Sequence, residues 1–167
     1  ILSSTSDSTS STKELLNITH TTSGTPAAGI GTDIAFTVET SSNNNEKGMI
    51  LETLTTDVTS GQEDFDFVVK LMENGTSAAE RLRLSSAGNL TINGALLPST
   101  ANVAALGSAS NEWSDLFLGD GSVINFGNDQ DVTLTHVADT GILLNGTKQL
   151  QFGDSGTYIN QSSDGIL

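Results

Sequence analysis

The sequence has no cysteine and, among its 167 residues, only two prolines, one tryptophan and one tyrosine. Without cysteine the chain can form no disulfide and has no thiolate for catalysis or metal binding. Aromatic residues make up only 5% of the chain, so a thick core built around bulky rings is hard to fill. No run approaches the roughly 18 apolar residues of a membrane-spanning helix, and no signal peptide is visible, so we expect no membrane insertion.

Basic side chains are also scarce. Six Lys and Arg stand against 20 Asp and Glu, which gives a formal net charge of -14 at pH 7. A nucleic-acid site needs Lys and Arg to neutralise phosphates, so we expect no nucleic-acid partner, and attraction to an anionic membrane is disfavoured for the same reason. The acidity favours solubility and resistance to self-association, and a requirement for divalent cations is the alternative interpretation.

What the sequence does contain points to β structure. Ser, Thr, Asn and Gly are abundant, and these residues favour turns and short strands over helices. Leu, Ile, Val and Phe together make up about a quarter of the chain, above the roughly 20% below which disorder is the default. We therefore expect an all-β protein. The chain starts at Ile1 and ends inside what reads as a repeat, which suggests a piece of something longer.

The first half predicts a small antiparallel β domain. A Ser/Thr-rich N-terminal segment over 1–12 precedes it, and the domain itself spans 13–94. Apolar residues alternate with polar ones over short runs bounded by Gly, Asn and Asp, which is the pattern of half-buried strands. The expected strands are 14–20, 33–39, 47–58, 64–72, 80–85 and 89–93, with a hairpin turn at "SAGN" between the last two.

A connector over 95–112, rich in Ala and Ser, leads into a repetitive region over 113–167; we expect one helical turn in the connector near 101–106. The repetition is visible in "LFLGDGSVINFG" (116–127) and "LQFGDSGTYIN" (150–160). Aligning each Phe-Gly pair gives an offset of 26 residues, and "TGILL" then falls near the final "DGIL". A period in the twenties is typical of stacked β architectures with one supersecondary unit per repeat.

One such repeat has too little apolar surface to stand alone, and we find only about two of them. The covering surface is therefore expected to come from identical chains wrapped around a common axis, as in a triple β-helix or β-prism-like shaft. Self-pairing would also cover strand edges that otherwise invite aggregation. The residues expected to meet their symmetry mates are Leu118, Ile124, Phe126, Leu134, Leu143, Leu150, Phe152 and Ile159.

The phrases "LGSASNEWSDLFL", "INFGNDQDVTLTHV" and "LQFGDSGTYINQSSDGIL" resemble tandem repeats of bacteriophage tail-fibre and related virion proteins, especially those of marine tailed phages. The stretch from "GIGTDIAFTVET" to "AAERLRLSSAGNLTING" is similar to the β unit that often precedes them, so the resemblance covers about 29–167. It implies a homotrimeric, elongated, β-rich fibre on a virion, used for structure or host attachment, with other virion proteins and a host receptor as partners. It implies no catalytic motif.

Candidate chemistry is sparse. The only histidines, His20 and His136, lie far apart in sequence, and structural roles on strands are favoured over catalysis or metal binding, although a histidine near a three-fold axis could bind an ion. No "GxSxG" context supports a serine nucleophile. Asp64 and Asp66 have the strand spacing of a glycosidase carboxylate pair, but solvent-facing acids explain them equally well. We expect no enzyme, no catalytic residue, no metal ligand and no cofactor.

The acidic turns "GDGS" (119–122) and "GNDQD" (127–131) are similar to calcium loops without matching the EF-hand or nonapeptide patterns, and turn formation explains them. Trp113 is expected to pack, either anchoring the connector or capping the core. The leading interpretation is a structural fibre segment. The alternatives are a receptor-binding module that contacts host glycans through "SSNNNEKG" (41–48), a bacterial surface adhesin or filament subunit, and a glycan-degrading spike.

Overall fold

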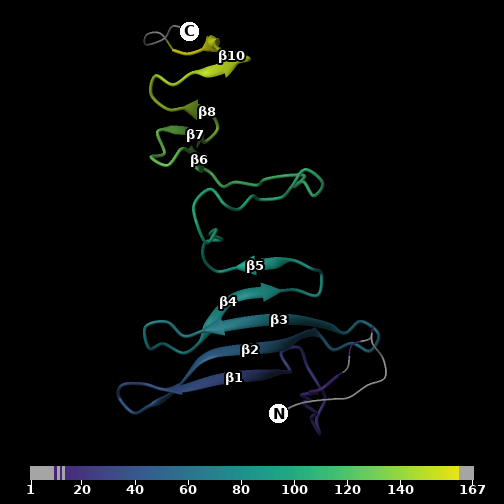
Figure 1. Ribbon diagram of the computed structural model, residues 1–167. Coiled ribbons are helices and arrows are strands. Elements are labelled where there is room, and N and C mark those ends of the chain that lie inside the picture. The colour runs from purple at the N-terminus through teal and green to yellow at the C-terminus, as the bar shows by residue number, and fades with distance from the viewer. Residues whose placement is uncertain (1–9, 11, 13, 162–167) are drawn as a thin grey trace. The chain divides into compact units, whose positions relative to one another are not determined.

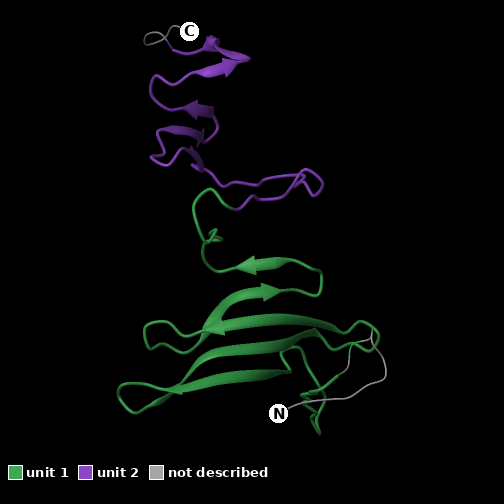
Figure 2. Cartoon of the chain, in the orientation of Figure 1, with its two compact units in different colours: residues 1–103 green, residues 104–167 purple. Residues whose placement is uncertain are grey.

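The structure, a computed structural model, describes residues 10, 12 and 14–161. In this part of the chain it is all-β and antiparallel, with ten strands and no helix (Figure 1). The chain divides into two compact units, residues 1–103 and 104–167 (Figure 2). The boundary lies inside the segment 95–112 that the sequence marks as a connector. Most of the Ser/Thr-rich segment 1–12 lies outside the described residues.

The first unit contains one five-stranded sheet in which each strand pairs with the next along the chain (Figure 1). Alternating apolar and polar residues produce the strands, and Asn or Gly residues with positive φ, such as Asn43 and Gly88, turn the chain between them. The predicted "SAGN" hairpin is present, with the Gly88 N–H donating to the Ser85 carbonyl at 2.9 Å. The strands are β1 (Gly31–Glu39), β2 (Asn45–Asp57), β3 (Asp64–Leu71), β4 (Ala79–Leu84) and β5 (Leu90–Ile92).

The predicted strand at 14–20 is wrong, because this segment joins no β ladder. It runs beside the sheet instead, where Leu16 and Ile18 line an open hollow of about 350 Å³ together with Ile34 and Phe67. The His20 ring contacts the sheet through Nδ1, 2.9 Å from the Gly31 carbonyl oxygen. Alternation shows that one side of a segment is apolar, but it does not show that the segment pairs with a strand. Here the apolar side chains Leu16 and Ile18 contact a face of the sheet instead.

The predicted helical turn at 101–106 is also wrong. The chain there forms turns and bends, and no helix is present among the described residues. Asn102 has a φ of 61°, in the left-handed region, whereas a right-handed helical turn requires a negative φ near −60°. The Ala-rich composition of the connector therefore does not determine its backbone conformation.

The second unit contains two small antiparallel sheets. One has three strands in the order β6-β7-β8, and the other is the pair β9-β10. Before them, an isolated bridge joins Ser108 to Asn111. The strands are β6 (Val123–Phe126), β7 (Val132–Val137), β8 (Gly141–Leu144), β9 (Leu150–Phe152) and β10 (Asp154–Ile159).

The sequence repeat is a structural repeat. Ile124 pairs with Leu134 across β6 and β7, and the residues aligned with them, Leu150 and Ile159, pair with each other across β9 and β10. The glycines after the two aligned phenylalanines, Gly127 and Gly153, have φ angles of 83° and 79°. A positive φ at that point favours glycine, which explains why the Phe-Gly pair recurs. The alignment of "TGILL" with the final "DGIL" lies outside the described residues.

Very little of the chain is buried within itself. Among the described residues, Val68 is the only buried hydrophobic side chain, and Thr55 and Asp66 are the buried polar ones. The accessible surface of the chain is 13576 Å², whereas a compact monomeric protein of this mass exposes roughly 7,800 Å². A single copy therefore leaves much more surface uncovered than a globular monomer does.

Candidate functional site

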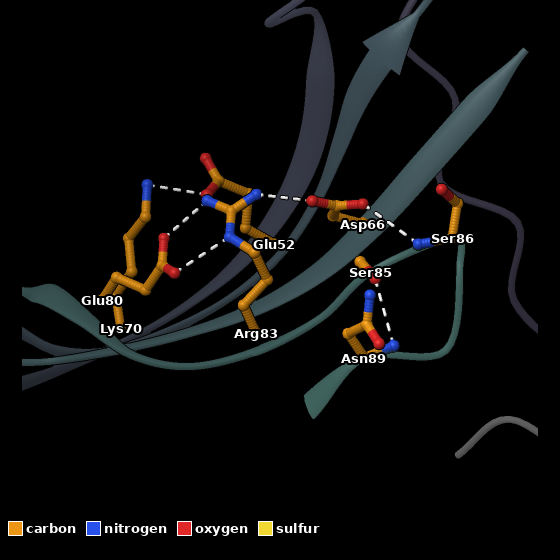
Figure 3. Close-up of polar contacts among 8 residues, drawn as sticks. All are labelled: Glu52, Asp66, Lys70, Glu80, Arg83, Ser85, Ser86 and Asn89. Carbon is orange, nitrogen blue, oxygen red and sulfur yellow. Dashed lines mark hydrogen bonds and ion pairs between the residues drawn. The ribbon is translucent and has the colours of Figure 1, made fainter. Parts of the chain in front are cut away.

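One face of the five-stranded sheet carries a cluster of paired charged side chains, and we call it the charged face (Figure 3). Its centre is Val68, whose direct cross-strand neighbours are Glu52 and Arg83. Val68 is fully buried. The aliphatic stems of its long charged neighbours can cover it, so its burial requires no second layer of secondary structure. The charged face comprises Glu52, Asp66, Lys70, Glu80 and Arg83.

These charges form two linked sets of ion pairs on strands β2 to β4. The Arg83 guanidinium donates to Asp66 at 2.7 Å and to both carboxylate oxygens of Glu80 at 2.9 and 2.6 Å (Figure 3). Lys70 lies 2.6 Å from the Glu52 carboxylate. The backbone N–H of Ser86 completes the set by donating to Asp66 at 3.1 Å. Each of the five charges in this cluster therefore has an opposite charge within the same sheet.

The ion pairs hold the acids in their charged forms. Hydrogen bonding from Arg83 lowers the pKa of Asp66, with a further contribution from the Ser86 N–H, and it lowers the pKa of Glu80 as well. The two carboxylates in turn raise the pKa of Arg83. Asp66 therefore serves as a buried partner of Arg83, while Asp64, which the sequence places beside it, is exposed at the start of β3 opposite Asp57.

The opposite face, which we call the apolar sheet face, carries no ionisable side chain over three cross-strand rows. Phe67, Val69 and Leu71 of β3 share this face, and the central row crosses all five strands. The rows are Ile34, Leu51, Val69, Leu82 and Ile92; Thr32, Thr53, Phe67, Leu84 and Leu90; and Phe36, Met49, Leu71 and Ala79. Phe36, Phe67, Leu84 and Leu90 are 40 to 57% exposed.

The second unit also presents apolar side chains on one face of each small sheet, which together we call the repeat face. Ile124 and Leu134 share this face with Phe126 in the three-stranded sheet, and Leu150, Phe152 and Ile159 share it in the pair β9-β10. Seven of the eight residues predicted to meet symmetry mates are exposed, at 40 to 55%. The chain does not enclose them by itself. The repeat face comprises Ile124, Phe126, Leu134, Ile142, Leu144, Leu150, Phe152 and Ile159.

Leu143 belongs to the predicted set but does not share the repeat face. It pairs with Thr135 in β7, which places it on the opposite side of the sheet from Leu134. Ile142 and Leu144 occupy the repeat face instead, opposite His136 and Leu134. In "GILL" two consecutive leucines follow an isoleucine, so composition alone cannot fix the phase of the alternation; the register with β7 fixes it. Leu118 lies beside the repeat face, in an open hollow of about 320 Å³ that Ile124 and Leu134 also line.

The two histidines lie in different units and share no site. Nδ1 of His136 accepts from the Gly121 N–H at 3.4 Å and lies 3.6 Å from an Asp120 carboxylate oxygen, so it joins a turn to strand β7. The structure brings no group of three or more potential metal-binding side chains together within the described residues. The acidic turn at 127–131 is bound to a later part of the chain, since Lys148 lies 2.9 Å from Asp131 and lowers the pKa of that carboxyl.

Two further predicted features are placed by the structure. Trp113 is 68% exposed, and its ring lies against Gly107, where a Cβ would come within 3.0 Å of the indole. The candidate glycan loop 41–48 is only partly a loop: residues 41–44 form the β1–β2 turn, and the rest belongs to β2. Sequence reasoning missed the Arg83 ion-pair set, although the alternation in "DFDFVVK" (64–70) already separates Asp66 and Lys70 from the phenylalanines.

No helix in the described residues has the length and apolar character needed to cross a membrane. Comparisons with protein-family models, with curated proteins and with solved structures find no match to this chain. Function must therefore be argued from the exposed surfaces themselves.

Proposed function

We propose that this chain is a structural segment of a homotrimeric virion fibre, such as a phage tail fibre, that supports host attachment. Its role is mechanical and requires no catalytic group or cofactor. In this proposal the second unit forms an intertwined shaft in which the repeat faces of sister chains cover one another. The partners are copies of the chain itself, neighbouring virion proteins and, directly or through another part of the fibre, a host surface receptor.

The observation that carries the proposal is the repeat face. The same cross-strand apolar pair occurs in both sheets of the second unit, at Ile124–Leu134 and Leu150–Ile159, and most of these side chains are about half exposed in one chain. Burying one such side chain contributes on the order of 1.5–3 kcal/mol, which a chain gains only if another surface covers it. The first residues of the two pairs are 26 positions apart and the second residues 25, and recurrence at a nearly constant offset is typical of stacked repeats.

The test compares two substitutions on neighbouring residues of β6. Phe126→Asp places a charge on the repeat face, whereas Asn125→Asp places the same charge on the other face of the same strand, opposite Thr133. Phe126 is 48% exposed within one chain, so a lone chain tolerates the charge there. We expect Phe126→Asp to abolish the trimer in light scattering and Asn125→Asp to leave it intact.

Circular dichroism separates loss of assembly from loss of fold, because a chain that keeps its first unit keeps β signal. A Phe126→Asp variant with unchanged stoichiometry and thermal midpoint would overturn the assignment of the repeat face as an interface. An Asn125→Asp variant that loses assembly to the same extent would show that charge anywhere in β6 is disruptive, which also contradicts it.

A further inference from the structure

The apolar sheet face of the first unit is a second uncovered surface, separate from the repeat face. Three cross-strand rows of this face contain no Asp, Glu, Lys, Arg or His. A sheet with one apolar face needs a second layer against that face, and the packed layers of two sheets lie about 10 Å apart. The first unit supplies no second sheet within the described residues.

The chain's own N-terminal segment covers only part of this face. Leu16 and Ile18 line the hollow beside Ile34 and Phe67, yet they are themselves 57% and 44% exposed. Leu84, which lies on the same face in strand β4, remains 44% exposed. The segment therefore extends the apolar surface rather than closing it.

The distribution of charge identifies a second copy of the chain as the occupant. The chain carries 20 acids and six bases, so two copies brought together at random would repel. On this sheet Glu52, Asp66 and Glu80 lie on the charged face, where Lys70 or Arg83 pairs with each of them. Two apolar sheet faces can thus meet without burying an unpaired carboxylate, which would be costly.

The chemistry of the face fits an apolar partner better than a glycan. Sugar hydroxyls need polar groups to bond with, and the three rows offer only the hydroxyls of Thr32 and Thr53, which lie 2.8 Å apart and bond to each other. The face also keeps apolar surface to bury, because Phe36, Phe67, Leu84 and Leu90 are 40 to 57% exposed in one chain.

We infer that the apolar sheet face of β1 to β5 is an interface with the same face of sister chains. The inference rests on the proposed homotrimer and extends it to the first unit, which then has its own contacts between copies rather than being carried passively by the shaft. The rows through Val69 and Phe67 form the centre of this interface, and the charged face points outward to solvent.

The absence of cysteine permits a direct test. Leu84→Cys puts a thiol on the apolar sheet face, and Ala35→Cys puts one on the opposite face, where Ala35 is exposed and pairs with Ile50. Cysteine is a small apolar residue, so both variants keep the sheet. The rate of maleimide modification of each full-length variant is measured in native buffer and divided by its rate in denaturant, alongside light scattering.

We expect the Leu84→Cys thiol to react at least about tenfold more slowly than the Ala35→Cys thiol in a trimeric sample. Equal rates in a trimer would overturn this interface and leave the proposed shaft standing. Equal rates in a monomer would overturn both. A monomer with a protected Leu84→Cys thiol would show that the chain covers its own face, which also overturns both.

Discussion

At the scale of single residues, the charged face predicts how stability depends on pH. Asp66 and Glu80 have pKa values lowered by Arg83 in the folded chain, relative to about 3.9 and 4.3 when unfolded. A lowered folded pKa stabilises the fold above the unfolded pKa, and that contribution is lost as the pH falls through the folded pKa. We therefore expect the midpoint temperature of thermal unfolding to be constant near neutral pH and to decrease once the pH is below about 4.

Replacing Asp66 with Asn isolates this effect. The variant removes one partner of a buried ion pair and leaves Arg83 with Glu80 alone, so its thermal midpoint should fall by several degrees at pH 7. The difference from the parent protein should shrink in acid, where the parent loses the same pair. Asp64→Asn, an exposed position on the same strand, is the matched control. Equal shifts in both variants, or a difference that grows in acid, would contradict the account.

At the scale of elements, the glycine after each repeated phenylalanine sets the turn. Gly153 has a φ of 79° with open space around its Cα, so Ala there introduces only backbone strain, which costs about 1–2 kcal/mol. Gly127→Ala should cost more, because a Cβ there would lie 3.1 Å from Asp129 and 3.2 Å from Asp131. Gly119→Ala, at a glycine without positive φ, should change the unfolding free energy little. Denaturant titration measures all three, and a loss of unfolding free energy at Gly119→Ala as large as at Gly153→Ala would contradict the role of positive φ in these turns.

The sequence predicts a strand reliably where apolar–polar alternation and turn residues indicate the same boundaries. Strands β1 to β5 are recovered within a few residues because alternation and turn residues coincide at their ends. The face that Leu143 occupies and the pairing of the segment 14–20 cannot be predicted from local sequence, because each depends on a neighbouring segment. Which face Leu143 occupies depends on its register with β7, and the segment 14–20 contacts the sheet through Leu16 and Ile18 without pairing to the edge strand β1. The ion pairs of Arg83 depend likewise on β3 and β4 being adjacent.

At the scale of the whole molecule, the composition already indicates a chain that does not complete its own core. Few aromatic residues, many turn residues and a repeat of about 26 residues predict surfaces left for other chains. In the structure, Val68 is the one hydrophobic side chain buried among the described residues, and two apolar faces remain open. Composition does not indicate which partner covers these faces, because an apolar face can pack against any apolar surface.

Multi-angle light scattering of the purified chain tests the central claim most directly. If sister chains cover the repeat face, the mass at micromolar concentration is three times the 17.3 kDa of one chain, and it stays so on dilution until the β signal is lost. A folded species with the mass of a single chain, stable across the same dilution series, would contradict the account.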